Sequence, residues 1–356
     1  MRRLFSWALA PAMLMAAGSA SAGSLDIRNA ALRVVIIPEA RSDVSVTVVK
    51  TNPRLPIWVS KDLTGATVTG RVAWFALFGR PIWCGAGGDV YVWGVGRIAN
   101  ADLPQIVVRM PLDAQVSAGG GVFGAISASN RLDLNVSGCG DWVVGNVHDR
   151  LAVSNSSSAA VRTGTAGQMA LQVSGSGRII TRAVANGLDV GLSGSGAIMV
   201  EQASGPVSIR GSGSGELVVN GGRATSVDVQ VSGSGDVRFK GVAEDLRANL
   251  SGDGQISAGS VTRSLGVDIS GSGDMAVEQA SGTVRAQISG SGALRIDGGH
   301  ASNVDARLSG SGDVDFAGVA DTLNASASGS GNLRVARVTG AVVSSTSGSG
   351  RVSVNR

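Results

Sequence analysis

The sequence predicts an all-β protein: a right-handed parallel β-helix, or solenoid, of about 19–20 residues per coil with an N-terminal β cap. Two observations support this fold class. A Ser-Gly-x-Gly tetrad returns along most of the chain, and apolar residues alternate with polar ones between the tetrads. The 53 glycines among 356 residues exclude long helices, because each interior helical glycine costs about 1 kcal/mol. With 43% hydrophobic and only 16% charged residues, the chain is also too apolar to be disordered.

Residues 1–22 are predicted to form a signal peptide. Arg2 and Arg3 precede an apolar run, and Ala20-Ser21-Ala22 forms a small-residue cleavage motif. The rest of the sequence holds no apolar stretch of 18 residues, so we expect no transmembrane segment after cleavage. The mature protein is therefore expected to be exported to the periplasm, the outer surface or the extracellular medium.

Residues 23–115 are predicted to form the N-terminal β cap, with an aromatic-rich insertion at 72–93. Such a stretch can close the open end of a solenoid. It can also project as a contact loop, because Trp and Tyr stack on sugars and anchor protein interfaces. The sequence leaves both interpretations open. The candidate binding residues are Trp74, Phe78, Trp83, Tyr91 and Trp93.

Residues 116–356 are predicted to be β-helix repeats, with the tetrad at one corner of each coil. Glycine allows positive φ angles and close approach between the backbones of neighbouring coils. The serine hydroxyls can bond to exposed backbone groups and to one another. A first tetrad lies at 137–140, and Ser156-Ser157-Ser158 is a degenerate copy. The later tetrads start at residues 174, 193, 212, 232, 251, 270, 289, 309, 328 and 347.

Between the tetrads, the apolar residues recur with a period of two, as in Val227, Val229 and Val231. This period indicates strands with one buried face and one solvent face, with Asp228 and Gln230 on the latter. One coil cannot bury its apolar face alone, so successive coils must stack. The crossover rule favours the right-handed form.

Cys84 and Cys139 are the two cysteines of the chain. In an oxidising compartment they can form a disulfide, or they can remain two small buried residues. The sequence does not decide between these, because it does not give the separation of the two Cα atoms. The absence of a CxxC motif argues against redox and zinc chemistry.

The arginines are scattered singly among acidic residues, and the formal charge is +4. A nucleic-acid partner requires clustered positive charge, so this class of function is not expected.

An enzyme of the polysaccharide lyase or hydrolase type is the alternative function, because many β-helices are such enzymes. Its site would need converging carboxylates. One coil holds Asp141, His148 and Asp149, with Arg150 beside them. We interpret Asp149 and Arg150 as a corner ion pair and His148 as a polar loop residue. The sequence therefore predicts no catalytic residue, no metal site and no cofactor.

The segment Leu25-Asp26-Ile27-Arg28, followed by residues 44–48 and by strands such as 188–196, resembles the GIN domain family, known as the "putative autotransporter adhesin head domain". The resemblance covers nearly all of the mature chain, although residues 72–93 depart from the family's N-terminal pattern. It implies an exported bacterial protein with a right-handed β-helix. The predicted function is a non-enzymatic, adhesin-like envelope or surface scaffold, with a saccharide or an envelope or surface protein as partner.

Overall fold

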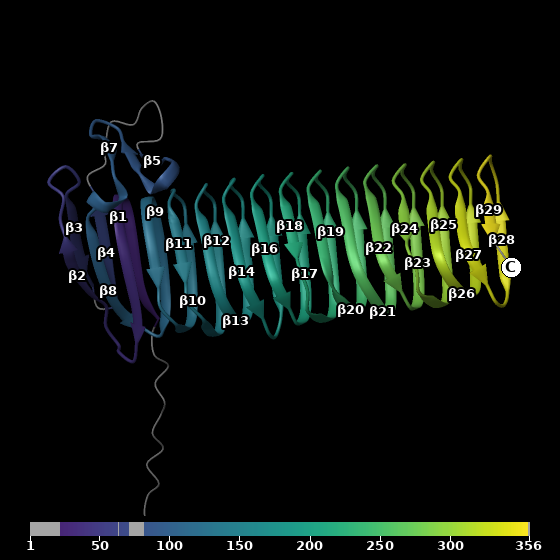
Figure 1. The fold of residues 1–356 in the computed structure, drawn as a ribbon, viewed down its shortest axis with the longest axis horizontal. Coiled ribbons are helices and arrows are strands. Elements are labelled where there is room, and N and C mark those ends of the chain that lie inside the picture. The colour runs from purple at the N-terminus through teal and green to yellow at the C-terminus, as the bar shows by residue number, and fades with distance from the viewer. Residues whose placement is uncertain (1–21, 63, 71–81, 355–356) are drawn as a thin grey trace, which may run out of the picture.

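The computed structural model describes residues 22–62, 64–70 and 82–354. The chain is all-β and forms the stacked parallel coils of a β-solenoid of about 13 turns, which confirms the predicted fold class (Figure 1). The predicted signal peptide, apart from Ala22, lies outside the described residues, as do Trp74 and Phe78.

Each coil of the repeats contributes one strand to each of two parallel sheets. We call these the pre-tetrad sheet and the post-tetrad sheet, because the tetrad connects the first to the second within a coil. Several long strands turn the opposite corner and so belong to both sheets. These are β13 (Ala160–Val173), β20 (Asp236–Leu250), β21 (Gln255–Ile269) and β26 (Val314–Ala327).

The other strands of the repeats belong to one sheet each. The pre-tetrad strands are β10 (Ser129–Val136), β12 (Val147–Asn155), β15 (Leu188–Leu192), β17 (Gly205–Gly211), β19 (Arg223–Val231), β23 (Gly282–Ile288), β25 (His300–Leu308) and β28 (Val342–Thr346). The post-tetrad strands are β11 (Asp141–Val144), β14 (Arg178–Val184), β16 (Ala197–Ala203), β18 (Glu216–Val219), β22 (Asp274–Ala280), β24 (Leu294–Ile296), β27 (Leu333–Val338) and β29 (Val352–Val354).

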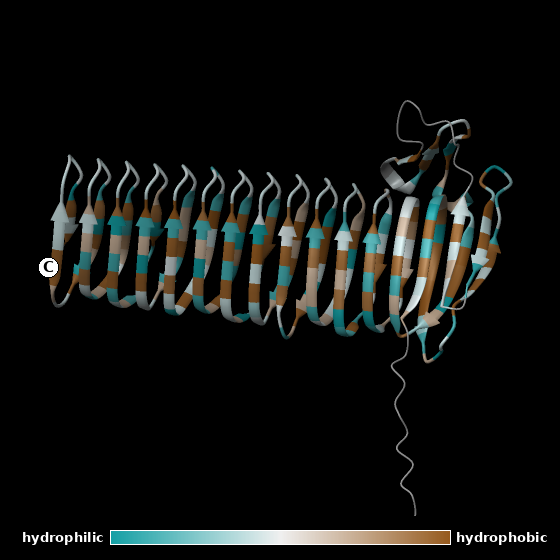
Figure 2. Cartoon of the chain, turned by 180° about the vertical axis from the view of Figure 1, so that it is seen from behind, coloured by the Kyte–Doolittle hydropathy of each residue, from teal (hydrophilic) through white to brown (hydrophobic). Residues whose placement is uncertain are grey.

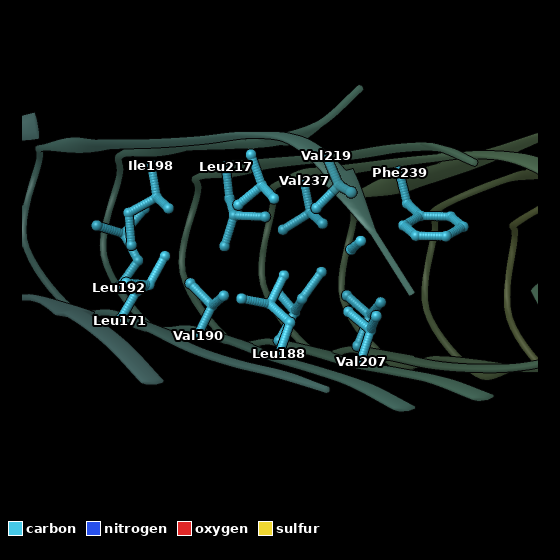
Figure 3. Close-up of a cluster of buried hydrophobic side chains, with 14 of the residues drawn as sticks. Leu171, Leu188, Val190, Leu192, Ile198, Val207, Leu217, Val219, Val237 and Phe239 are labelled. Atoms are coloured by element: carbon cyan, nitrogen blue, oxygen red, sulfur yellow. The ribbon is translucent and has the colours of Figure 1, made fainter. Parts of the chain in front are cut away.

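The core lies between the two sheets. Apolar and polar residues alternate along the strands, as the bands of colour in Figure 2 show. Figure 3 shows Ile198 and Leu217 of the post-tetrad sheet pointing toward Val190 of the pre-tetrad sheet. Val229 is 1% exposed, as its place in the period-two pattern predicts. In the register of the parallel strands, apolar residues lie beside apolar residues of the next coil, for example Val190 beside Ile209.

The tetrads form the row of narrow loops along the upper edge of the rod in Figure 1. Their second residue must be glycine because the coils approach closely there. A Cβ atom on Gly233 would lie 2.1 Å from the carbonyl oxygen of Gly213. Positive φ angles are a minor factor, since of the tetrad glycines only Gly140 and Gly348 have one. The expectation that the tetrads supply left-handed backbone is therefore wrong for the others. Glycines with positive φ occur instead at or near the opposite corners, at Gly187, Gly205, Gly222, Gly282 and Gly299.

The degenerate copy Ser156-Ser157-Ser158 lacks glycine, and a buried Asn155 holds this loop instead. The Nδ2 of Asn155 donates a hydrogen bond to the carbonyl of Ala159, at 2.8 Å. Its Oδ1 accepts one from the backbone N–H of Ser157 at 3.1 Å and one from the Ser157 hydroxyl at 2.6 Å. A side chain thus holds this loop through hydrogen bonds within the loop itself.

At the N-terminal end, the order of strands in the stack differs from their order in the chain. The strand β1 (Gly23–Glu39) forms a whole coil and pairs in parallel with β9 (Asp113–Ile126) on one side. On its other side it pairs in parallel with β4 (Gly65–Gly70) and β8 (Gln105–Pro111). The first strand of the described chain is therefore an interior layer of the stack.

Two antiparallel strands end the stack. The strand β2 (Ser45–Lys50) pairs with β8, and β3 (Ile57–Lys61) pairs with β4. Both lie at the extreme N-terminal end of the rod in Figure 1. A change from parallel to antiparallel pairing stops the repeat of coils, so these strands cover the core at this end.

Candidate functional site

The segment between β4 and β8 forms a small sheet of its own, outside the solenoid. It is antiparallel, with β5 (Ile82–Cys84), β6 (Val90–Val92) and β7 (Gly96–Ile98) in that order. The 3-10 turns η1 (Ala86–Gly88) and η2 (Asn100–Asp102) precede β6 and follow β7. In Figure 1 this sheet lies beside the tetrad edge of the first coils. We call it the inserted sheet.

The inner face of the inserted sheet packs against the solenoid. Its buried residues alternate with the outward ones and form a second hydrophobic core with Ala31 of β1, separate from the core of the coils. Other members of this core come from the neighbouring loops and from the first tetrad. Its buried residues are Ala31, Leu55, Ile82, Val90, Val92, Ile98, Leu103 and Cys139.

A disulfide joins the inserted sheet to the solenoid. The Sγ atoms of Cys84 and Cys139 are 2.11 Å apart, and the Cα atoms are 5.8 Å apart. Cys84 ends β5, and Cys139 is the third residue of the first tetrad. The bond therefore fixes the base of the inserted sheet to the tetrad edge. Of the two alternatives that the sequence left open for these cysteines, the structure has the disulfide.

The outer face carries a row of large side chains across all three strands. Trp83 of β5 lies opposite Tyr91 of β6, which lies opposite Arg97 of β7. The rings of Trp83 and Tyr91 are stacked, with centroids 5.6 Å apart and planes inclined by 1°. Trp83 is nevertheless 47% exposed, so the stack leaves much of the indole open to solvent.

Arg97 completes this row as a fixed cation. Its Nε donates a hydrogen bond to Oδ2 of Asp89, at 2.7 Å. This hydrogen bond and the negative charge of Asp89 raise the pKa of Arg97 above its usual value. The row thus presents an aromatic surface that ends in a permanently charged group. Arg97 and Asp89 were not among the predicted site residues. A sequence signal for the pairing of Trp83 with Tyr91 was present, because the glycine-rich run 85–88 between two short apolar segments is typical of a β-hairpin.

Trp93 lies at the tip between β6 and β7 and is 58% exposed. The turn requires glycine, because Gly94 and Gly96 have φ angles of 79° and 90°. The guanidinium of Arg54 donates a hydrogen bond to the carbonyl of Val95 and holds the tip from outside. The structure therefore brings Trp83 and Tyr91 into contact and places Trp93 on the adjacent tip.

The residues considered for the alternative enzyme do not converge. Asp141 begins β11 directly after a tetrad, whereas His148 and Asp149 lie beyond the far end of β11, at the opposite corner. His148 Nδ1 lies 2.8 Å from Asp149 Oδ1. The expected ion pair between Asp149 and Arg150 is wrong: the partner is Arg131, at 3.7 Å, because parallel pairing brings the preceding coil alongside. Among the residues that the structure describes, no three His, Cys, Asp or Glu side chains could hold a metal ion.

Within the described ranges, no helix is long and apolar enough to cross a membrane. A family model with the description "Putative auto-transporter adhesin, head GIN domain" matches residues 98–222 and residues 186–300. These two matches together reach from residue 98 to residue 300, which is more than half of the 356-residue chain. No curated protein sequence matches the chain.

Solved structures with a similar course of the chain include proteins of two Parabacteroides species. A "putative adhesin" from Parabacteroides distasonis is 16% identical, with 83% of this chain and 93% of that chain covered and a TM-score of 0.30. A "putative lipid binding protein" from the same species is 12% identical, with 94% and 93% covered and a TM-score of 0.27. A "putative adhesin" from Parabacteroides merdae is 11% identical, with 94% and 92% covered and a TM-score of 0.27.

Proposed function

This chain belongs to the family described as "Putative auto-transporter adhesin, head GIN domain", and from that premise we propose that it is a non-enzymatic, adhesin-like binding protein of the cell envelope or surface. Its contact surface is the outer face of the inserted sheet, formed by Trp83, Tyr91 and Trp93. The partner is a saccharide or an envelope or surface protein.

The observation that carries this proposal is the stacked, half-exposed pair of Trp83 and Tyr91. The buried residues on the other face of the same strands already hold the inserted sheet to the solenoid, so the outer row is not needed for that packing. Trp and Tyr present large, rigid apolar areas with a polar atom at the edge, and such side chains dominate the energy of many interfaces. The inserted sheet therefore presents exposed aromatic side chains from a fixed position, which favours a role in binding a partner.

The disulfide and the turn at Trp93 support the same proposal. A contact surface that is already fixed loses less conformational freedom on binding, which increases affinity. The Cys84–Cys139 bond fixes one end of the inserted sheet, and the Arg54 hydrogen bond to Val95 fixes the other. Beyond this sheet the coils extend as a rod. At ~4.8 Å per coil, about 13 turns span roughly 60 Å, which sets the contact surface well apart from the C-terminal coils.

Alanine variants of the outer row test the proposal. We expect Trp83→Ala and Tyr91→Ala to weaken binding to arrayed glycans or to purified envelope proteins at least about tenfold, since loss of ~1.4 kcal/mol is tenfold. Thermal unfolding followed by circular dichroism should stay nearly unchanged. Trp58→Ala is the matched control, because Trp58 is 52% exposed but lies on β3, outside the inserted sheet.

Two results would contradict the proposal. If Trp83→Ala unfolds the protein, the outer row of the inserted sheet serves the fold and is not the contact surface. If the protein cleaves a defined polysaccharide and Asp141→Asn, His148→Ala or Asp149→Asn abolishes that cleavage, the protein is an enzyme.

A further inference from the structure

Two glycines on the pre-tetrad sheet have no structural requirement for glycine. A Cβ atom on Gly191 of β15 would meet nothing nearer than the Cγ of Gln172, at 3.7 Å. One on Gly211 of β17 would meet nothing nearer than a methyl group of Val231, at 3.8 Å. Neither glycine has a positive φ angle. Both positions differ from the second residue of the tetrads, where a Cβ atom would collide with the neighbouring coil. Glycine inside a strand nevertheless weakens the strand.

Gly191 opens a groove on the outer side of the pre-tetrad sheet. The groove has a volume of ≈ 710 Å³ and runs across successive coils from Ser154 to Ser251. Gly191 removes one side chain from the outward column of the sheet. Gly211 lies in register with the inward-facing Leu192 and Val231, so its missing side chain leaves space inside the coil and not in the groove. The side chains that the groove offers to a ligand are therefore mainly polar.

The walls of the groove carry hydrogen-bonding groups without net charge. The amides of Gln172, Gln230 and Asn249 and a row of tetrad serines line it. Its one cation, Arg210, donates a hydrogen bond at 2.9 Å to the carboxylate of Asp189, which neutralises it. Among the described residues, the side-chain amides of Gln172 and Asn249 have no hydrogen-bond partner. These groups are free to donate to and accept from a ligand.

We propose that this groove binds a neutral, extended glycan chain that lies along the axis of the rod. Sugar hydroxyls match the amides and serine hydroxyls that line the groove. The coils repeat every ~4.8 Å, which is close to the residue repeat of an extended glycan, so successive sugars would meet equivalent positions. A nucleic acid or another polyanion would require unpaired positive charge, which the walls lack.

A second groove on the same sheet differs from the first in its charge. Gly266 of β21 is also open, with nothing nearer to a Cβ atom than the carbonyl oxygen of Leu246, at 3.9 Å. It opens a groove of ≈ 540 Å³, but charged side chains such as Arg247, Asp268 and Arg285 line that groove. The same fold thus carries a neutral groove and a charged groove, and the neutral one is the glycan site.

The decisive experiment compares Gly191→Gln with Gly266→Gln. Binding of neutral linear hexasaccharides of glucose, mannose and N-acetylglucosamine is measured by calorimetry, with a hexamer of a uronic acid as the acidic probe. We expect one neutral hexasaccharide to bind the unmodified mature protein and Gly266→Gln equally. Gly191→Gln, which places a side chain in the groove, should bind it at least about tenfold more weakly while unfolding at the same temperature.

Additional variants separate this site from the inserted sheet. Gln172→Ala should weaken the same binding, and Trp83→Ala should leave it unchanged, so failure of the proposed contact surface and failure of this groove are distinguishable. The inference is overturned if no neutral hexasaccharide binds, if only the uronic acid hexamer binds, if Gly266→Gln weakens binding as much as Gly191→Gln, or if Trp83→Ala abolishes it.

Discussion

The repeat coils and the N-terminal end of this solenoid are built by different rules. In the coils, each strand pairs with the strand one coil earlier and one coil later, so neighbours in the stack are about 19 or 20 residues apart. At the N-terminal end, β1 pairs with β4, β8 and β9, and two antiparallel strands follow outside them. The comparison shows that a periodic sequence specifies the coils locally, whereas distant segments must meet to form the end.

The two regions are also held together differently. The coils share one continuous core, and their tetrads stack backbone against backbone. The inserted sheet has only a small second core and a disulfide. Because all five tryptophans after the predicted cleavage site lie at or before Trp142, tryptophan fluorescence reports mainly on the N-terminal end, whereas circular dichroism reports mainly on the coils.

The largest effect is expected from a charge placed in the coil core. Val229→Asp puts a carboxylate at a position that is 1% exposed, so we expect the free energy of unfolding to fall by several kcal/mol. Gln230→Asp, the next residue on the solvent face, is the matched control and should be nearly silent. Denaturation followed by circular dichroism measures both. Equal stability of the two variants would contradict the assignment of the inward column.

The disulfide should matter to the N-terminal end and little to the coils. Replacing Cys84 and Cys139 together by Ala should cost roughly 2–4 kcal/mol, because the bond closes a 55-residue separation. The loss should appear in the fluorescence transition before it appears in circular dichroism. Thiol counting on denatured, unreduced protein provides the check, since two free thiols would show that the bond is absent.

Much of the solenoid could be predicted from the sequence, and the reasons are physical. The tetrad spacing and the period-two alternation gave the coils and their inward columns, such as Leu188, Val190 and Leu192, because both signals are local. The interior place of β1 was not predictable in this way, since it depends on pairing with β4 and β8, which lie far along the chain. The role of the tetrad glycines was predicted in part. The expected close approach of the coils is present, but the expected positive φ angles are absent from all tetrad glycines except Gly140 and Gly348.

The candidate site was predictable only in part. The concentration of aromatic residues marked Trp83, Tyr91 and Trp93, but composition alone could not show which rings meet or which face is exposed. The groove at Gly191 is harder still. Its glycine stands in a regular strand pattern, and the sequence does not show that the space around it is empty.

A tetrad glycine should be less tolerant of change than the serine beside it. In Gly233→Ala the new methyl group would lie 2.1 Å from the carbonyl oxygen of Gly213, and overpacking of this kind costs about 1–3 kcal/mol. Ser234→Ala, in the same loop, is exposed and should change stability by less than about 0.5 kcal/mol. An unchanged unfolding midpoint for Gly233→Ala would show that the coils can separate there without loss. The comparison of the two regions would then lose its main physical basis.

The smallest expected effect is a pH dependence of the stability of the coils, which arises from Asp245. Hydrogen bonds from Arg263 and then from Ser264 lower the pKa of this carboxyl from 3.8 to about 2. A carboxyl whose pKa is lower in the folded state stabilises the fold above the unfolded pKa, and this contribution is lost as the pH falls from about 4 to about 2. The gain in stability is small because the Asp245 side chain is 36% exposed, where water screens the ion pair.

Thermal unfolding between pH 7 and pH 2, followed by circular dichroism, measures this contribution in the unmodified protein and in Asp245→Asn. The two melting temperatures should differ at pH 7 and converge toward pH 2. Asp253→Asn is the control, because Asp253 is exposed and has no ion pair among the described residues, so its curve should follow the unmodified protein throughout. If Asp245→Asn instead runs parallel to the unmodified protein down to pH 2, the contacts between the coils of β20 and β21 rest on packing alone, and charge adds nothing to the stack.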